Sequence, residues 1–238
     1  MNGFPKNVKL LSTTRFIEGG RSSENFDNFN LALHVNDHKE NVLENRKILK
    51  SRFNLPSEPV WINQTHSSIG IDASSINEMV EADASYTSKA GVVCSILTAD
   101  CLPVFVSKKN GTMVGLAHAG WRGLVSGVIE NLIRSFNSNG DNLIVHLGPA
   151  ISKNYFEVGD EVMRHYLTKN INFKRSFTVK NNKYYLDLYD AARVILEDLK
   201  IMSISGGDRC TFHETSNFFS YRRDGINSGR MAHLIWMT

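Results

Sequence analysis

The chain has 238 residues, of which 42% are hydrophobic and 21% are charged, and its formal net charge at pH 7 is +3. A chain of this length and composition can bury a sizeable core, so we expect one domain that spans residues 1–238. The positive charges are spread along the chain rather than gathered in blocks, which argues against nucleic acid and against an acidic membrane as partners. A small anionic co-substrate is compatible with this charge.

The cysteines and the N-terminus bear on the cellular compartment. Cys94, Cys101 and Cys210 form no C-x-x-C pair and leave an odd number, which fits a reducing cytoplasm better than a disulfide framework. Residues 1–6 lack the apolar core of a signal peptide, and no stretch approaches the roughly 18 apolar residues of a membrane span. We therefore predict a cytoplasmic protein.

The first half of the chain alternates strand and helix signals. A capped stretch with apolar residues at near-helical spacing predicts a helix over 36–53. The stretch 91–97 is continuously apolar, which is typical of a strand covered on both faces. In order, the expected elements are a strand over 8–16, a loop over 19–23, a helix over 36–53, a short strand that carries Trp61, irregular chain over 69–82 and a strand over 91–97.

The stretch 97–123 organises the rest of the chain. Residues 102–107 and 112–117 are apolar, and Asn110-Gly111 between them is a hairpin signal, so we expect a strand, a tight turn and a second strand. Cys101 begins the first strand and His118 ends the second. Antiparallel pairing should therefore bring both side chains to the same edge of a sheet, within reach of one ion.

A third ligand is needed for a metal site, and the best candidate is His66, at the end of the run that begins at Trp61. Structural zinc sites usually pair ligands roughly two to four residues apart and use four of them, whereas three ligands from separate elements suit a catalytic ion with one open position. The wide spacing of His66, Cys101 and His118 therefore favours a catalytic metal.

The second half of the chain continues the alternation, which predicts an α+β fold of mixed α/β layers, with mixed sheets and packed helices. The expected elements are a helix over 120–136, a strand over 142–147, a helix over 158–167, a hairpin over 177–187 and a helix over 191–199. The first of these helices starts beside His118, so its free amides and Arg122 could bind an anion. Arg122 could equally form a structural ion pair.

Five motifs together resemble the laccase-domain (YfiH-like) family. The resemblance covers nearly the whole chain, from Phe29-Asn30-Leu31 to Gly229-Arg230-Met231-Ala232. It implies the same fold class, of the YfiH/CNF-like type, and it implies that His66, Cys101 and His118 are zinc ligands. The motifs are Gln64-Thr-His66, Thr98-Ala-Asp-Cys101, Ala117-His-Ala-Gly-Trp-Arg-Gly123, Gly148-Pro-Ala-Ile151 and Phe218-Phe-Ser-Tyr-Arg-Arg-Asp-Gly225.

The resemblance also implies an activity. The family is described as having purine nucleoside phosphorylase activity, with adenosine deaminase and methylthioadenosine phosphorylase activities beside it. An older label of the family, polyphenol oxidase or laccase, would require copper instead of zinc. The implied partners are therefore a small-molecule nucleoside and phosphate, and both a monomer and a homodimer remain open.

These reactions assign provisional roles to other residues. Deamination by a zinc-activated water needs a carboxylate that moves protons, and the candidates are Asp83 and Asp100. The H-x-E and P-C-x-x-C signature of zinc deaminases is absent from the sequence. Phosphorolysis needs cationic groups that hold phosphate and polar groups that bind the nucleoside. The candidates are Arg122, Arg222, Arg223 and Arg230 for phosphate, with Asn30 and Gln64 for substrate; Gln64 could instead brace His66, and the arginines could be a solvated cluster.

Three alternatives belong to other classes. A copper oxidase is disfavoured, because a multicopper enzyme needs His-x-His pairs and the eight histidines include none. A cysteine hydrolase or amidase would use Cys101 as nucleophile and His118 as base, with Asp100 or another carboxylate as the orienting group. The third alternative is a metal-binding protein without catalysis.

Overall fold

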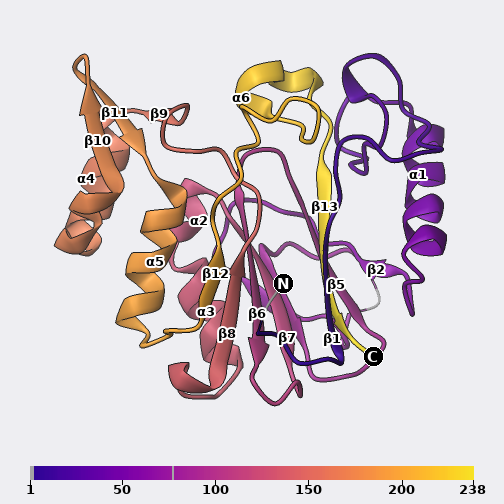
Figure 1. The fold of residues 1–238 in the computed structure, drawn as a ribbon, viewed down its shortest axis with the longest axis horizontal. Coiled ribbons are helices and arrows are strands. Elements are labelled where there is room, and N and C mark those ends of the chain that lie inside the picture. Colours follow the sequence, from indigo (N-terminus) through magenta and orange to yellow (C-terminus); the bar gives the residue numbers. More distant parts are fainter. Residues whose placement is uncertain (1–2, 77) are drawn as a thin grey trace.

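The computed structural model describes residues 3–76 and 78–238, and its main feature is two β-sheets between layers of helices (Figure 1). The six-stranded sheet has the order β12-β8-β6-β7-β4-β3, and the four-stranded sheet has the order β1-β13-β5-β2. A third, three-stranded sheet has the order β10-β11-β9. This confirms the predicted α+β fold of mixed layers.

The bounds of the elements follow. The strands are β1 (Val8–Ser12), β2 (Pro59–Val60), β3 (Gly70–Asp72), β4 (Ala84–Thr87), β5 (Val93–Thr98), β6 (Leu102–Lys108), β7 (Val114–Ala119), β8 (Leu143–Leu147), β9 (Glu157–Val158), β10 (Phe177–Lys180), β11 (Lys183–Leu186), β12 (Ile204–Gly206) and β13 (Met231–Met237). The α-helices are α1 (Lys39–Arg52), α2 (Trp121–Ser126), α3 (Val128–Ser135), α4 (Asp160–Lys169), α5 (Leu188–Asp198) and α6 (Tyr221–Asp224). Short 3-10 helices span Glu24–Phe26, Gly140–Asn142, Ile171–Ser176 and Gly225–Asn227.

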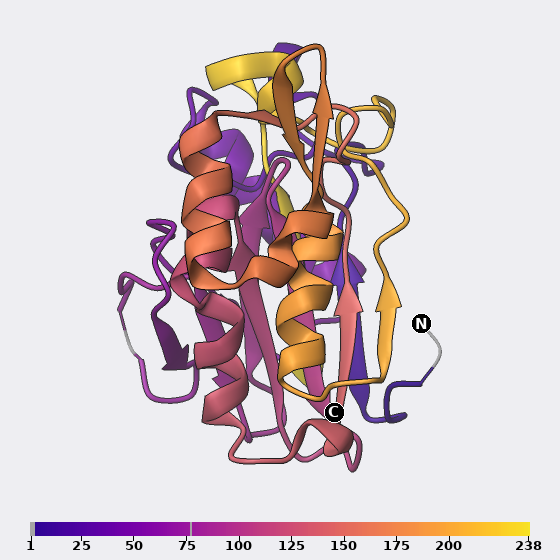
Figure 2. The ribbon, with the colours of Figure 1, turned by 90° about the vertical axis from the view of Figure 1, so that its left-hand side faces the viewer.

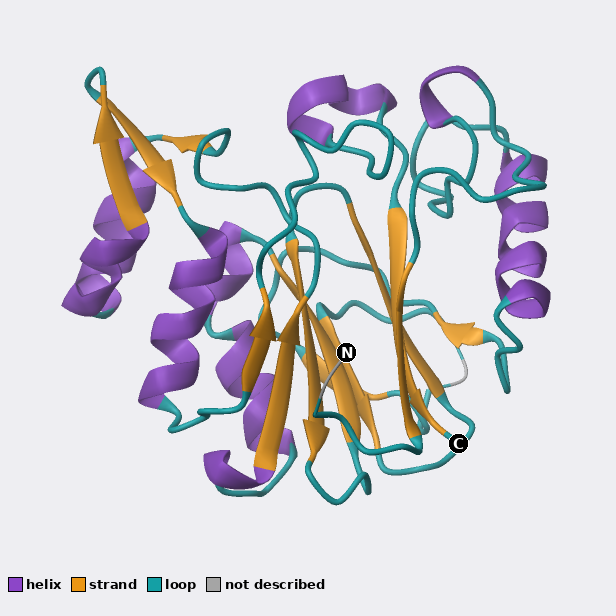
Figure 3. Cartoon of the chain, in the orientation of Figure 1, coloured by secondary structure: helices purple, strands orange, loops and turns teal. Residues whose placement is uncertain are grey.

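The alternation of side chains along β6 shows how the layers are built. Val104 and Val106 pack in a cluster with Leu132 of α3 and Ile195 of α5. Phe105, which points to the opposite face, packs in the core between the two large sheets. β6 is therefore covered on both faces, by helices on one side and by the four-stranded sheet on the other (Figure 3).

The four-stranded sheet is also covered twice. Cys94 and Ile96 of β5 face the core between the sheets. Val93 and Leu97, on the other face, pack with Leu49 of α1. The layer order is thus helices, sheet, sheet and α1, and the continuous apolar run predicted for a doubly covered strand is confirmed in β5.

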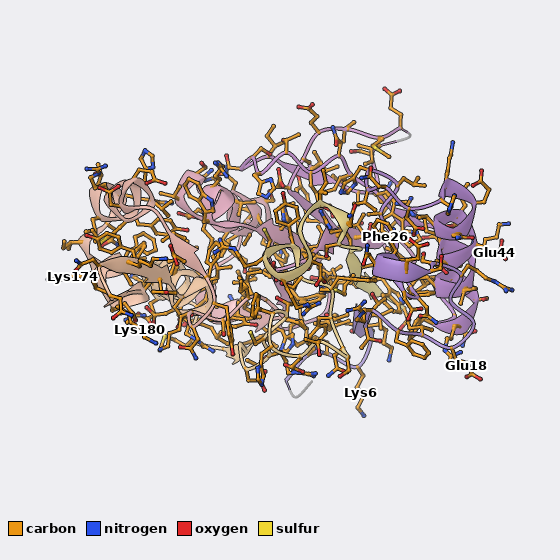
Figure 4. The ribbon with its side chains drawn as sticks, turned by 90° about the horizontal axis from the view of Figure 1, so that it is seen from above. Lys6, Glu18, Phe26, Glu44, Lys174 and Lys180 are labelled. Atoms are coloured by element: carbon orange, nitrogen blue, oxygen red, sulfur yellow. The ribbon has the colours of Figure 1, made fainter. Side chains whose placement is uncertain are left out.

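The views from two other sides agree with this layer order. In Figure 2, helices α4 and α5 lie in front of the strands. Seen from above in Figure 4, Glu44 on α1 and Lys180 in β10 lie at opposite ends of the molecule. No helix within the described residues 3–76 and 78–238 combines the length and the apolar character needed to cross a membrane.

Some predicted elements differ from the structure. The helix expected over 120–136 is two helices, because Gly127 has a φ of 94° and its left-handed conformation ends α2. The opening strand ends at Ser12, and the stretch expected to be irregular over 69–82 contains β3. The predicted elements do not include β13, which pairs with both β1 and β5 at the centre of its sheet.

The loop over 19–23 does not line the cavity described below. The Ser22 hydroxyl donates to Asp37 at 2.6 Å, and the Arg21 amide donates to the Asn45 side chain at 2.8 Å. Asn45 is buried on α1, so this helix holds the loop in place.

Candidate metal centre and its cavity

The hairpin of β6 and β7 brings Cys101 and His118 together, as its predicted turn requires. Leu102 pairs with Ala119 and Pro103 pairs with His118, so Cys101, one residue before β6, lies at the sheet edge where β7 ends. The Gly111 amide donates to the Lys108 carbonyl at 2.9 Å in the turn at the far end of the hairpin.

His66 comes from the loop that follows β2, and a single carboxylate holds this loop. The backbone amides of Thr65, His66 and Ser67 donate to Asp83 at 3.2, 3.1 and 2.6 Å, and the Ser67 hydroxyl donates at 2.7 Å. His66 has a φ of 59°, which a residue other than glycine rarely adopts. The hydrogen bonds to Asp83 stabilise this conformation and direct the imidazole toward Cys101.

Asp83 also orients His118. The Nδ1 atom of His118 lies 2.7 Å from the Asp83 Oδ1 atom, so this nitrogen carries the proton and donates to the carboxylate. The Nε2 atom of His118 is then the one available to a metal ion. A histidine ligand that donates its other N–H to a carboxylate is the common arrangement in metal sites.

The three side chains form a set that fits one ion. The ligand atoms of His66, Cys101 and His118 all lie within 4.8 Å of one another. The Cys101 Sγ atom is 3.8 Å from the His66 Nε2 atom, and the two imidazole rings are 4.8 Å apart at 68°. Two imidazole nitrogens and one thiolate are a donor set that suits zinc and leaves a fourth position open.

Gly120 leaves the space that this arrangement needs. A Cβ atom at this position would lie 2.9 Å from the Cys101 Sγ atom and 2.9 Å from the His66 Cδ2 atom. Real Cβ atoms do not approach other atoms so closely, so a side chain here would push the sulfur and the imidazole apart.

Two members of the triad formed by His66, Cys101 and His118 stabilise each other's charged form, namely Cys101 and His118. Burial alone would raise the pKa of the Cys101 thiol, but the charge and hydrogen bonds of His118 and His66 outweigh it and lower this pKa to about 6. Burial opposes the charged form of His118, yet the Cys101 thiolate and Asp83 raise its pKa to about 9. Cys101 and His118 therefore form a thiolate–imidazolium pair at neutral pH.

The pKa of Asp83 is lowered to about 2. Its burial would raise the pKa, but hydrogen bonds from His118 and Ser67 and the charge of His118 prevail. The lowered pKa keeps the Asp83 carboxylate ionised at neutral pH, although the residue is 0% exposed to solvent.

A cavity of about 780 Å³ opens over the triad. α6, at the top of Figure 1, contributes Tyr221 and Arg222 to its lining. Ile62, Leu97 and Ile151 supply apolar surface, and Asp100 is the carboxylate among the lining residues. The aromatic lining residues are Trp61, Trp121, Phe156 and Tyr221, and the arginines are Arg46, Arg122, Arg222 and Arg230.

The predicted phosphate-binding arginines differ in how many of their guanidinium donors are already bonded within the protein. The Arg122 guanidinium lies 4.3 Å from the Trp121 ring and has no hydrogen bond or ion pair to any described residue. Arg222 lies over the Phe156 ring at 5.3 Å and donates to the Glu157 carbonyl at 3.0 Å. Both side chains face the cavity with donors available to a ligand.

Arg223 does not line the cavity. Its guanidinium donates to the carbonyls of Thr211, Phe212 and Phe218 at 2.9 to 3.0 Å and pairs with Asp224 at 2.8 Å. These contacts use the hydrogen-bond donors of Arg223 within the fold. Of the two neighbouring arginines, Arg222 therefore lines the cavity and Arg223 does not.

The other predicted substrate contacts lie in different places. Arg230 lines the cavity, although it also donates to the Gly229 carbonyl at 3.0 Å. Asn30 is fully buried outside the lining, and its Oδ1 atom accepts the Arg230 amide at 2.9 Å. Gln64 lines the cavity but makes two hydrogen bonds to the backbone of Leu97, at 2.8 and 2.7 Å, which hold it in place.

Sequence reasoning did not single out Arg46, Trp61 and Gly120 as site residues. Arg46 lies on α1, and its guanidinium stacks on the Trp61 ring at 4.0 Å. Nothing in the local pattern signals this contact. Gly120 stands inside the motif that carries His118, and an unexplained glycine beside a ligand was the available signal.

The likeness to known proteins extends over nearly the whole chain. A family model described as multi-copper polyphenol oxidoreductase laccase matches residues 9–238. A protein of Escherichia coli K12 named purine nucleoside phosphorylase YfiH is 44% identical over 237 residues, which cover 98% of this chain and 95% of that protein. A Haemophilus influenzae protein named purine nucleoside phosphorylase is 41% identical over 235 residues, with coverage of 98% and 95%.

Solved structures show the same likeness. A Neisseria meningitidis protein is 41% identical with a TM-score of 0.93, and the match covers 99% of this chain and 96% of that one. The YlmD protein of Geobacillus stearothermophilus is 27% identical with a TM-score of 0.87, with coverage of 98% and 92%.

Replacing Cys101 by serine should remove most of the bound metal, because a hydroxyl is a much poorer zinc ligand than a thiolate. The measurement is elemental analysis of protein purified without added metal, with circular dichroism to verify the fold. The matched control is Cys210→Ser, which should keep its metal. In the wild-type protein the Cys210 sulfur lies outside the triad, 3.1 Å from the Ser152 hydroxyl. Full metal retention in the Cys101 variant would overturn the ligand assignment.

Replacing Gly120 by alanine should weaken metal binding by about tenfold or more, as changes beside the ligands of a metal commonly do. The added methyl group must displace the Cys101 sulfur or the His66 ring. Competition with a chelator measures the affinity. The control is Gly70→Ala, where the nearest atom to the new Cβ is the Ala84 Cβ at 3.7 Å. Equal affinities in the two variants would contradict the packing argument.

Proposed function

We propose that this chain, which belongs to the multi-copper polyphenol oxidoreductase laccase family, is a zinc-dependent purine nucleoside phosphorylase. Membership confirms the resemblance carried by the sequence motifs. We further propose that the protein deaminates adenosine and accepts methylthioadenosine. The observation that carries the proposal is the His66, Cys101 and His118 set at the base of a cavity lined by arginines.

The donor set and the histidine count support zinc over copper. Zinc bound by one thiolate and two imidazoles would keep a position for water and could lower the pKa of that water to roughly 7. Laccase chemistry needs a cluster of coppers held by His-x-His pairs, and the sequence contains no such pair. Copper oxidation of phenols is therefore the less favoured function, in spite of the family description.

The chain's own residues would bind and orient the reactants. Arg122 and Arg222 present guanidinium groups to the cavity and would hold phosphate, which an arginine can bind through two parallel hydrogen bonds. The aromatic rings and aliphatic side chains of the lining suit a flat purine base. Asp83 would hold the two histidines in place, because its buried carboxylate accepts hydrogen bonds from the His66 amide and the His118 ring.

Proton transfer requires a group within the cavity. Of the two candidate carboxylates, Asp100 lines the cavity and Asp83 does not. Burial raises the pKa of Asp100, although hydrogen bonds from Thr211, Arg222 and Ser220 oppose this rise. Asp100 is therefore the carboxylate we propose for proton transfer during deamination.

A cysteine hydrolase is the second candidate function, and one observation favours it. Cys101 would be the nucleophile, His118 the base that takes the proton of its thiol, and Asp83 the carboxylate that orients His118. The carboxylate is thus Asp83, whereas the sequence left Asp100 or another carboxylate open. Thiolate chemistry and metal binding compete for the same sulfur, so experiments on metal-free protein distinguish them.

Replacing Arg122 by alanine should reduce phosphorolysis by more than about tenfold, roughly 1.4 kcal/mol in transition-state stabilisation, and should largely spare deamination. The reason is that phosphorolysis alone uses the anionic co-substrate. Inosine cleavage at varied phosphate and adenosine deamination are measured in the same preparation.

The control is Arg134→Ala, an exposed arginine of α3 that bonds to Asn131 outside the cavity. It should leave both reactions unchanged. Equal loss of both reactions in the Arg122 variant would mean that this arginine binds the nucleoside or supports the fold instead of holding phosphate.

Metal-free protein should react with iodoacetamide at Cys101, and the rate should rise as the pH increases through about 6, where the thiol becomes a thiolate. Added zinc should block the reaction and restore phosphorolysis. Cys94 serves as an internal reference, because burial raises its pKa to about 12 and it is 0% exposed. Phosphorolysis or amide hydrolysis that persists without metal and stops on alkylation would favour the cysteine mechanism over the zinc one.

A further inference from the structure

Asp100 links segments that are far apart in the sequence. Its carboxylate accepts hydrogen bonds from the Thr211 hydroxyl at 2.6 Å, the Ser220 hydroxyl at 3.0 Å and the Arg222 amide at 2.7 Å. Its backbone carbonyl accepts the Ile151 amide at 2.9 Å. One side chain, 8% exposed, therefore joins the turn before β6 to the loop at Thr211 and to the start of α6.

The two ends of this link carry the two parts of the proposed site. Cys101 follows Asp100 directly in the chain, so the position of its sulfur depends on the backbone of Asp100. Arg222 lies in the first turn of α6 and presents its guanidinium to the same cavity. The carboxylate of Asp100 thus lies between a metal ligand and a phosphate-binding group.

The backbone of Asp100 needs external support. Its φ of 97° lies in a region that residues other than glycine rarely adopt. Such conformations persist where surrounding contacts hold them, and here the hydrogen bonds of the carboxylate and the carbonyl do so. Loss of the carboxylate contacts would allow the turn, and with it Cys101, to relax.

The segment that bonds to Asp100, residues 211–223, is held together by its own hydrogen bonds. The Arg223 guanidinium donates to the Thr211 and Phe218 carbonyls at 3.0 and 2.9 Å, and the Arg223 amide donates to the Ser220 hydroxyl at 3.3 Å. The Thr211 amide donates to Ala150 at 3.1 Å. A disturbance at Thr211 should therefore reach α6 as well as Asp100.

We propose that Asp100 is a positioning residue that couples Cys101 to Arg222, so that the metal ligand and the phosphate-binding arginine hold their geometry together. The proposal rests on the proposed function, because it takes phosphate as the ligand of Arg222. It adds a role for Asp100 that does not depend on proton transfer. Coupling between two sites is reciprocal, so phosphate binding and the metal site should each respond to the other.

The decisive variant is Thr211→Val, which removes one hydrogen bond to Asp100 and replaces neither a side chain that lines the cavity nor a titratable group. Asp100→Asn is the companion variant, because asparagine tolerates a positive φ but cannot accept all three donors. Thr215→Val is the control, since Thr215 lies in the same loop, is exposed, and makes no side-chain hydrogen bond to any described residue.

Two measurements are made on each folded variant, with folding verified by circular dichroism. Phosphate affinity comes from the shift of the melting temperature with inorganic phosphate, and the geometry of Cys101 comes from the cobalt–thiolate absorption of cobalt-substituted protein. We expect Thr211→Val and Asp100→Asn to bind phosphate roughly fivefold more weakly or worse, the low end of coupling between sites. Both should also shift the cobalt absorption, and Thr215→Val should match the wild type.

The outcomes separate this proposal from the proposed function. Wild-type phosphate affinity and cobalt absorption in Thr211→Val would overturn the coupling, and so would an effect confined to Asp100→Asn, which would point to charge or proton transfer alone. Absence of phosphate binding by the wild-type protein would defeat the proposed function. The cobalt spectra would then still decide whether Asp100 positions Cys101.

Discussion

The buried carboxylate of Asp83 is the interaction on which the candidate site depends. It joins a loop that has no regular structure to a histidine at the end of a central strand, through hydrogen bonds from three amides, one hydroxyl and one imidazole. A buried carboxylate is stable only when it is paired and hydrogen-bonded, so the loop must keep this conformation or leave the charge of Asp83 without partners. The same hydrogen bonds that stabilise the buried Asp83 carboxylate therefore position His66 and His118.

The cavity above the triad combines rigidity with positive charge. Arg46 stacks on Trp61 and donates twice to the Leu31 carbonyl, and Arg122 stacks on Trp121. An aromatic face stabilises a guanidinium without consuming its hydrogen-bond donors, so the group stays available to an anion. The charges come from segments distant in sequence, and a cavity lined by cations focuses the field on its contents.

Part of this arrangement could be predicted and part could not. The hairpin of β6 and β7 follows from two apolar runs around Asn110-Gly111, and antiparallel pairing then places Cys101 near His118. The interruption of the helix at Gly127 was missed, because a glycine within a helical pattern signals only a modest cost. The run over 231–237 is as continuously apolar as the stretch 91–97, apart from His233, so the same pattern indicates a strand covered on both faces at β13.

The sequence by itself determined the family, the fold class and the three side chains suited to one metal ion, because these depend on local patterns and on motifs that can be read in order. Only the tertiary structure decided that Asp100 lines the cavity while Asp83 does not, and that Arg222 and Arg223, adjacent in the chain, serve the cavity and the fold respectively. The physical reason is that burial and hydrogen-bond partners come from separate segments of the chain: Asp83 bonds to His118, 35 residues away, and Asp100 bonds to Thr211 and Ser220, more than a hundred residues away. No local pattern records such contacts.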